Sequence, residues 1–152
     1  MFDAEFIHME VAGLRHVHAP TLAEGPAGDL VVAWYGYPDV EYEAGRIVVA
    51  RRGRHAGEWK DRVVLFGDVR RSLGNPVLFF APDGNLHLLC ALIRGHYWTE
   101  AVVVGSTSSD GGRRWSDPRQ VRPEEGLMVR HAPVELRDGS LLLPAYDERR
   151  RE

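Results

Sequence analysis

The sequence predicts an all-β fold, and three observations support this prediction. Five segments are rich in β-branched and aromatic residues, as strands are: DLVVAWYG, GRIVVARR, NLHLLCALI, AVVVGSTSS and SLLLPAY. No segment shows a sustained helical period of apolar residues. Finally, three stretches of the chain resemble one another at a regular spacing, which indicates that one structural unit is repeated.

The three similar stretches each begin with small or polar residues and a proline. They are HAPTLAEGPAGDLVVAWYG from His18, NPVLFFAPDGNLHLLCALIRG from Asn75 and HAPVELRDGSLLLPAYDE from His131. The prolines, Pro20, Pro76 and Pro133, lie 56 and 57 residues apart. A period of this length, with several short strands in each repeat, is typical of the blades of a β-propeller. We therefore expect a β-propeller; isolated hairpins in an α+β fold are the alternative.

Each repeat is expected to contain four antiparallel strands. Blade one spans about 14–70, with strands PTLAE, DLVVAWYG, RIVVARR and KDRVVLFG. Blade two spans about 71–123, with strands PVLFFA, NLHLLCALI, AVVVGSTSS and one around RQVRP. Blade three, about 124–152, is incomplete, and residues 1–13 could form an outer strand that closes a ring. Because an open ring leaves strand edges exposed, we expect either part of a longer propeller or copies that associate as a homo-oligomer to complete one.

The stretch SSDGGRRWSDP, residues 108–118, places Ser108, Asp110, Gly112 and Trp115 at fixed offsets. An aspartate can accept hydrogen bonds from the N–H groups of its own turn, glycine allows a positive φ, and tryptophan can fold back as an apolar plug. The stretch is expected between the third and fourth strands of blade two. Blade one has a counterpart, RRGRHAGEW, that lacks the serine and the aspartate. We interpret the motif as a structural fastener of the blade; a direct contact with a ligand is the alternative.

Composition and charge restrict the functional class. A chain of 152 residues is about one ordinary domain with a real core. Its net charge of −3 argues against a nucleic-acid partner. Cys90 is the sole cysteine, so an internal disulfide is excluded, and its apolar surroundings predict a buried, unreactive thiol.

No cofactor and no metal are expected. The seven histidines form no H-x-x-x-H or H-E-x-x-H pair on one helix face, and the sequence holds no phosphate loop or dinucleotide motif. His18 and His131 with Asp147 are the alternative, as a metal-binding group. The N-terminal MFDAEFIHMEVAG has neither a basic start nor an apolar segment, and no apolar run reaches the length of a membrane span. We therefore expect a cytoplasmic protein without a membrane partner.

Polar residues are expected to gather at one end of the strands. The first and second strands of each blade are antiparallel, so the start of the first and the end of the second lie at the same face. That face is expected to collect His18, the loop 35–46, Asn75, Arg94, His96, Tyr97, Trp98, Arg130, His131, Asp147 and Glu148. Carboxyl groups can carry acid–base chemistry and cations can hold a charged substrate, so the face suits a saccharide.

Two sets of candidates follow from this placement. The catalytic candidates are Asp39, Glu43, His18, His131 and Asp147. The substrate-binding candidates are Arg94, Asn75, Tyr35, Trp98 and Arg130. His18 and His131 occupy equivalent positions of the repeat, which favours a shared role; histidines bonded to the backbone are the alternative. The loop GYPDVEYEAG, with Asp39, Glu41 and Glu43, has a solvated acidic loop as its alternative.

The motif S-x-D-x-G-x-x-W between two strands is the Asp-box, and with the three repeats it resembles the sialidase-like family of six-bladed propellers, also called the BNR-repeat or neuraminidase type. The resemblance covers about residues 14–148 and only the first half of such a domain. It implies that residues 1–152 form one partial sialidase-like propeller. It also implies a glycan-active protein, a glycosidase or related enzyme that cleaves an acidic sugar, with a carbohydrate as its partner.

The resemblance carries expectations about the site. In that family an arginine cluster holds the sugar carboxylate, a Tyr/Glu pair supplies the nucleophile and an aspartate in an early loop is the acid/base. The loop GYPDVEYEAG resembles this early loop by position, so Asp39 or Glu43 is expected in that role. True sialidases carry Arg-Ile-Pro where this chain has His18, Ala19 and Pro20, so the first arginine is absent. A non-catalytic propeller fragment that binds glycan or protein is the alternative function.

Overall fold

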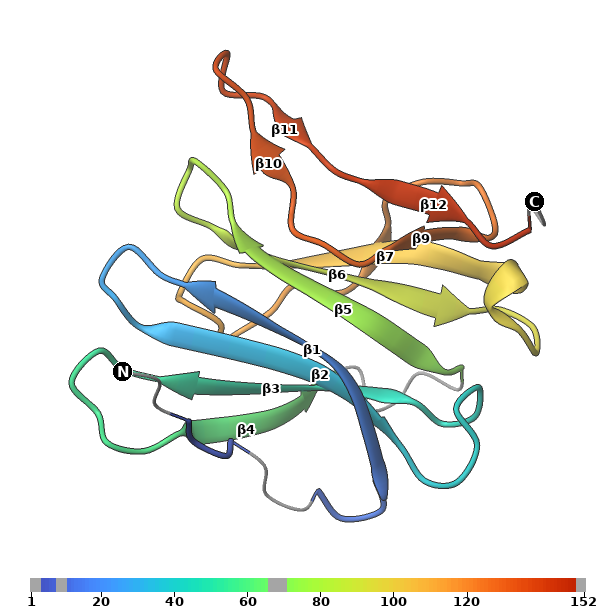
Figure 1. Ribbon diagram of the computed structural model, residues 1–152, viewed down its shortest axis with the longest axis horizontal. Helices are drawn as coiled ribbons and strands as arrows, with labels where there is room; N and C mark the ends of the chain where they lie inside the picture. Colours follow the sequence, from blue (N-terminus) through green and yellow to red (C-terminus); the bar gives the residue numbers. More distant parts are fainter. Residues whose placement is uncertain (1–3, 8–10, 66–70, 150–152) are drawn as a thin grey trace.

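The structure, a computed structural model, describes residues 4–7, 11–65 and 71–149 and is all-β (Figure 1). Sheet one contains β1 (His16–Glu24), β2 (Leu30–Tyr37), β3 (Arg46–Arg52) and β4 (Lys60–Leu65). Sheet two contains β5 (Leu73–Phe80), β6 (Leu86–Ile93), β7 (Ala101–Ser108) and β8 (Arg119–Gln120). Both sheets are antiparallel, and their strands follow the order of the chain. The described helical structure is the 3₁₀ turn η1 (Trp98–Glu100), and no described helix is long and apolar enough to cross a membrane.

Two small sheets lie beyond sheet two (Figure 1). β9 (Leu127–Val129) pairs with β12 (Ala145–Asp147), and β10 (Val134–Glu135) pairs with β11 (Leu141–Leu142). The expected single strand SLLLPAY is therefore divided, and Pro144, which has no N–H to donate, lies in the break. β9 was not expected, because three residues are too few to show an alternating pattern.

The first strand of each large sheet begins earlier than the sequence suggested. PTLAE and PVLFFA were expected to start at their prolines, but β1 and β5 start at His16 and Leu73. Each strand continues through a bulge, between His18 and Thr21 in β1 and between Gly74 and Val77 in β5. A proline is tolerated at a bulge because the ladder needs no N–H there.

The N-terminal segment does not form the expected outer strand within the residues that the structure describes. Residues 4–7 carry no strand, residues 11 and 14 make an isolated bridge, and residues 1–3 and 8–10 of the segment lie outside the described residues. The segment instead covers the outer face of sheet one, where Ile7, Val11 and Leu14 pack with Trp59 on buried residues of β2 and β3. Glu5 accepts a hydrogen bond from Trp59 Nε1 at 3.1 Å.

The main core lies between the two large sheets. Alternate residues of each strand face it, as the period of a strand requires. From sheet one these are Val31, Ala33, Tyr35, Tyr37, Ile47, Val49 and Leu65, and from sheet two Leu73, Leu78, Leu86, Leu88, Cys90, Val102 and Val104. The opposite face of sheet two packs on residues of β9, so the sheets are stacked in chain order. Cys90 is buried as expected, and burial raises its pKa to about 12.

The turn after β7 is closed by the side chains of the S-x-D-x-G-x-x-W motif. Ser108 Oγ donates to Asp110 Oδ1 at 2.9 Å and accepts from the N–H of Gly112 at 2.8 Å. Asp110 Oδ1 also accepts the N–H groups of residues 113 and 114, and Gly112 has a φ of 86°. Hydrogen bonds, first of all from the Arg114 N–H, hold the pKa of Asp110 well below its usual range. Trp115 Nε1 donates to Gly112 O at 3.1 Å while its ring packs on the main core.

Replacing Ser108 by alanine is expected to lower the free energy of unfolding by about 1–2 kcal/mol. Ser108 is 2% exposed, and its loss leaves a buried N–H and a carboxylate without one partner each. The matched control is Ser109→Ala, an exposed serine of the same turn, for which we expect no measurable change. Urea unfolding of both variants gives the comparison. Equal stability of Ser108→Ala and Ser109→Ala would contradict a fastening role.

Candidate functional site

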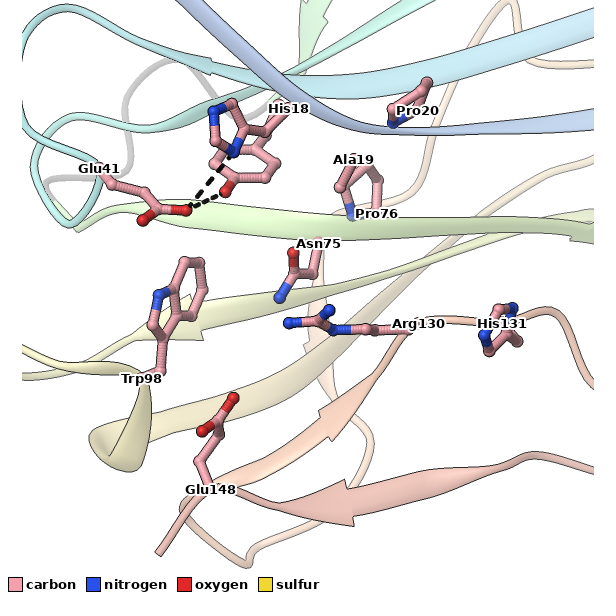
Figure 2. A pocket seen from close by; sticks show the side chains of 11 residues that line it. His18, Ala19, Pro20, Glu41, Asn75, Pro76, Trp98, Arg130, His131 and Glu148 are labelled. Atoms are coloured by element: carbon pink, nitrogen blue, oxygen red, sulfur yellow. Dashed lines mark hydrogen bonds and ion pairs between the residues drawn. The ribbon is translucent and has the colours of Figure 1, made fainter.

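A polar cavity of about 490 Å³ opens at one end of the strands (Figure 2). Its wall comes from β1 and β5, from the end of β2 and the loop after it, from η1 and from the chain after β9 and β12. The lining residues are His18, Ala19, Pro20, Tyr35, Glu41, Asn75, Pro76, Trp98, Arg130, His131 and Glu148. We call this space the polar cavity.

The two bulges turn equivalent backbone segments toward the polar cavity. Ala19 and Asn75 both have a φ of 47°, and each precedes a proline. The left-handed region is uncommon for alanine and less so for asparagine, but a residue before proline normally prefers extended backbone, so both positions are strained. Strain of this kind, about 1–3 kcal/mol per residue, persists where surrounding structure enforces it and is frequent at functional sites.

Glu41 is held on one wall by a tyrosine and a histidine. The buried Tyr35 donates its hydroxyl to Glu41 Oε1, and His18 Nδ1 lies 3.8 Å from the same oxygen. His18 Nε2 lies 3.4 Å from the hydroxyl of Tyr37. Burial, and then the Glu41 carboxylate, raise the pKa of Tyr35 far above its usual value, so Tyr35 remains a neutral donor. Figure 2 shows Glu41 reaching toward His18, with dashed lines to both partners.

Arg130 and Glu148 form the opposite wall. Arg130 Nε donates to the hydroxyl of Tyr146 at 2.9 Å, which fixes one edge of the guanidinium. In Figure 2 the rest of the guanidinium points toward Asn75 inside the cavity. Glu148 follows β12, and its N–H donates to Gly126 O at 2.9 Å, which fixes the backbone that carries the carboxylate. The wall thus offers a cation and an anion to a ligand.

Trp98 closes the remaining side. Its ring lies against Gly74, where an added Cβ would come within 2.4 Å of Cη2, so only glycine leaves room for it. It also packs edge-on against Tyr35, with ring centroids 6.3 Å apart. The loop before it is held by Glu100 Oε2, which accepts the N–H groups of His96 at 2.7 Å and Tyr97 at 3.1 Å. Trp98 is therefore a rigid part of the wall.

The structure brings together most of the residues that the sequence singled out. His18, His131, Tyr35, Asn75, Trp98 and Arg130 all line the polar cavity. These residues lie at one face, as expected for the starts of the first strands and the ends of the second strands. Their roles remain predictions.

Four candidates do not line the polar cavity, and local contacts explain why. Asp39 is paired with Arg15, whose Nη1 lies 3.1 Å from Asp39 Oδ1. Asp147 pairs with Arg149 at 2.8 Å. The alternative metal group of His18, His131 and Asp147 is not assembled either; among the described residues no three His, Cys, Asp or Glu side chains could hold a metal ion.

The other two lie at a neighbouring cavity. The tight turn closed by the Glu43 N–H and Val40 O, 2.9 Å apart, leaves Glu41 on the inner side and Glu43 at the neighbouring cavity. Arg94 donates to Gln120, lies 3.8 Å from Glu125, and also lines that neighbouring cavity. Of the three acidic residues of this loop, Glu41 therefore lines the polar cavity and Asp39 and Glu43 do not, while their catalytic roles stay predictions.

The sequence did not identify every residue of the site. Glu41 and Glu148 were both on the expected face but were not chosen, because neighbouring acidic residues give no sign of which one points inward. Ser72 was missed altogether. It is buried, its Oγ accepts the Gly45 N–H at 2.9 Å, and it lies 3.4 Å from Glu41 O, so it ties the loop after β2 to sheet two.

Comparisons with known proteins identify the fold. A family model described as "BNR repeat-like domain" matches residues 28–152. Among solved structures the chain is similar to "Hadza microbial sialidase Hz136", with a TM-score of 0.76 and 19% identity, over 91% of this chain and 34% of that chain. It is also similar to a protein of unknown function from Dyadobacter fermentans DSM 18053, with a TM-score of 0.63 and 16% identity, over 85% of this chain and 50% of that chain.

At such identities the likeness to these structures concerns the fold alone. The chain spans about a third of the first and half of the second. A search of the curated proteins finds no match. The family model nevertheless covers most of the chain, and it fits both the repeats and the stacked antiparallel sheets. This protein therefore belongs to the BNR repeat-like domain family and has a sialidase-like fold.

Proposed function

We propose that the protein binds an acidic saccharide in the polar cavity and hydrolyses its glycosidic bond, in the manner of a sialidase-like glycosidase. One observation carries the proposal: an arginine, two carboxylates and an indole ring, from Arg130, Glu41, Glu148 and Trp98, surround one cavity. A volume of about 490 Å³ lies within the range of small-molecule sites.

Binding is assigned to Arg130, Asn75 and Trp98. Tyr146 accepts its hydrogen bond from Nε of Arg130, and the centroid of its ring lies 5.4 Å from the guanidinium carbon. The Nη groups are therefore available to a carboxylate, which a guanidinium can bind through two parallel hydrogen bonds. The amide of Asn75 lines the same cavity and offers a donor and an acceptor to hydroxyl groups. The indole of Trp98 gives a flat apolar surface for the face of a sugar ring.

The chemistry is assigned to the two carboxyl groups. Glu41, with His18 and Tyr35 around its Oε1, is proposed as the group that gives a proton to the leaving oxygen as the anomeric C–O bond breaks. Glu148, on the other wall, would stabilise the positive charge that develops on the sugar ring. Water then adds to the anomeric carbon, and its proton returns to Glu41. This pairing of two carboxyl groups is the usual scheme of glycosidases, and it differs from the Tyr/Glu nucleophile that the resemblance to sialidases implies.

One observation favours a second function, glycan binding without hydrolysis. Arg130 is the one arginine among the described residues that line the polar cavity, and His18 occupies the place of an expected arginine. A single permanent cation holds a carboxylate less firmly than the arginine cluster that the resemblance implies. The binding function would use the same residues without the proton transfer.

Sheets one and two are proposed to be successive blades of a propeller, with β9–β12 in the next blade. Their stacking in chain order and the similarity to a sialidase support this arrangement. Part of a longer propeller and association of copies are the two ways to close the ring. Light scattering separates them, because only association gives a mass that is a multiple of the single chain.

The experiment that tests the function combines two assays of the same chain. Methylumbelliferyl glycosides of sialic acid, glucuronic acid and galactose report hydrolysis, and calorimetric titration with the free sugars reports binding. We expect release of the fluorophore from an acidic glycoside and none from the galactoside. Binding of an acidic sugar without release would support the second function. If no sugar binds and no fluorophore is released, both functions are overturned.

A further inference from the structure

We propose that a second cavity next to the polar cavity binds the following unit of the saccharide, and that this unit is also acidic. The inference rests on the proposed function and deepens it: the substrate would be an oligosaccharide with acidic groups on adjacent units. We call this second space the outer cavity. It has a volume of about 560 Å³ and is lined by Tyr42, Glu43, Ala44, Arg71, Ser72, Ile93, Arg94, Gly95, His96 and Tyr97.

The two cavities share an aromatic wall. Trp98 lines the polar cavity, whereas Tyr42 and Tyr97 line the outer cavity. The ring of Tyr42 packs edge-on against Trp98 at 6.1 Å and against Tyr97 at 6.0 Å between centroids. We call Tyr42, Tyr97 and Trp98 the aromatic ridge. Since Glu41 and Tyr42 are also consecutive residues with one in each cavity, a chain of two sugars could pass from one cavity to the other across this ridge.

The aromatic residues of the ridge keep much of their surface open. Tyr97 is 61% exposed and Tyr42 is 37% exposed. Clusters of large exposed aromatic side chains are unusual on a soluble domain and mark interaction sites when they adjoin a cavity. Their flat faces are suited to the apolar face of a sugar, as the indole of Trp98 is in the polar cavity.

The charge of the outer cavity selects the class of sugar. Arg71 and Arg94 are permanent cations at its wall, and His96 adds a third basic group. Glu43 is the single carboxylate among the described residues that line it. Arg94 is partly satisfied by Gln120 and Glu125, but Glu125 lies 3.8 Å away and leaves most of the guanidinium hydrogens for a ligand. A cavity with excess positive charge favours a carboxylate or sulfate on the bound unit.

Both walls of the outer cavity are fixed before a ligand arrives. Ser72 holds the loop after β2 through its hydrogen bond to the Gly45 N–H. Glu100 holds the loop after β6 through the N–H groups of His96 and Tyr97, and these bonds lower the pKa of Glu100 below its usual range. A preformed wall lowers the entropic cost of binding.

The test compares three probes by calorimetric titration of Glu41→Gln, in which bound saccharide is not hydrolysed. The probes are sialic acid, α2,8-linked disialic acid and sialyllactose, in which the second unit is absent, acidic and neutral, respectively. Galacturonic acid and digalacturonic acid extend the series to uronic acids. We expect the acidic dimer to bind about tenfold more tightly than its monomer, because charged and aromatic contacts are added. Sialyllactose is expected to lie between them.

Two variants place this gain in the outer cavity. Tyr97→Ala is expected to weaken binding of the acidic dimer about fivefold and to leave the monomer unchanged. Arg71→Gln is expected to remove the preference for the acidic dimer over sialyllactose, with an effect that shrinks as salt is added. The matched controls are Phe6→Ala, an exposed aromatic outside both cavities, and Arg137→Gln, an exposed arginine in the turn between β10 and β11.

The outcomes separate the inference from the proposed function. Equal affinity for monomer and dimer, or an equal loss for both in Tyr97→Ala, would overturn the inference and leave the proposed function standing. A dimer preference that Arg71→Gln leaves intact would overturn the acidic nature of the second unit. Failure of every probe to bind would overturn the proposed function and the inference with it.

Discussion

Arg130→Gln is expected to weaken binding of an acidic monosaccharide at least tenfold, since a charge-assisted bidentate pair contributes about 1.5–3 kcal/mol. Glutamine keeps much of the length and some of the hydrogen-bonding capacity of the side chain but removes its charge. Arg130 is exposed, so the fold should persist. The control is Arg137→Gln, which changes net charge equally outside the polar cavity. Calorimetric titration with sialic acid and with a uronic acid gives the dissociation constants.

A neutral sugar shows whether Arg130 acts through its charge. Binding of galactose should be equally weak in the wild type and in Arg130→Gln, because galactose has no carboxylate to lose. Tyr146→Phe removes the hydroxyl that accepts from Arg130 Nε and should weaken acidic binding less, about two- to fivefold, since the charge remains. Equal losses for acidic and neutral sugars in Arg130→Gln would contradict a role in carboxylate recognition.

Much of the fold follows from short-range patterns in the sequence. The expected strand RIVVARR coincides with β3, and the expected DLVVAWYG differs from β2 by one residue at each end. Both strands alternate between two buried faces, and β3 begins and ends at an arginine, so local composition determines them. The starts of β1 and β5 were misplaced because a proline normally ends a ladder, and only the paired strand shows that the chain continues through a bulge.

The site was less predictable because it depends on contacts between distant segments. Repeat alignment was enough to gather His18, Asn75, Trp98 and His131 at one face, since it needs only strand direction. Gly74 occupies the position that His18 and His131 have in the other repeats, and its lack of a side chain leaves room for Trp98. No local sequence pattern predicts that Trp98 fills this space.

The choice among the acidic residues after β2 shows the same limit. Asp39 is drawn away by Arg15, 24 residues earlier in the chain, and Ser72, 31 residues later than Glu41, ties this loop to sheet two. The composition of the loop after β2 suggested that one of its carboxylates lines the site. Only the tertiary contacts decide that it is Glu41.

Glu41→Gln is expected to lower kcat for an acidic glycoside by at least about 100-fold, the usual contribution of a positioned acid or base. Glutamine is nearly isosteric and can still accept the hydrogen bond from Tyr35, but it has no proton to exchange with a leaving group. Because the sugar carboxylate is assigned to Arg130, KM and the binding of the free sugar should change little. The measurement is steady-state hydrolysis of a methylumbelliferyl glycoside together with calorimetric titration.

Glu43→Gln is the matched control, because Glu43 lies in the same loop and carries the same charge but lines the outer cavity. It should retain near wild-type kcat on a monosaccharide glycoside, whose leaving group does not extend a second acidic unit into that cavity. A large loss in Glu43→Gln and none in Glu41→Gln would return the acid–base role to one of the two residues, Asp39 and Glu43, that the sequence alone favoured. A large loss in Glu148→Gln with none in Glu41→Gln would instead place the proton donor on the opposite wall, beside Arg130. Each result assigns the proton to a different carboxyl group. The contacts of His18 and Tyr35 with Glu41 are the reason that we expect the loss in Glu41→Gln.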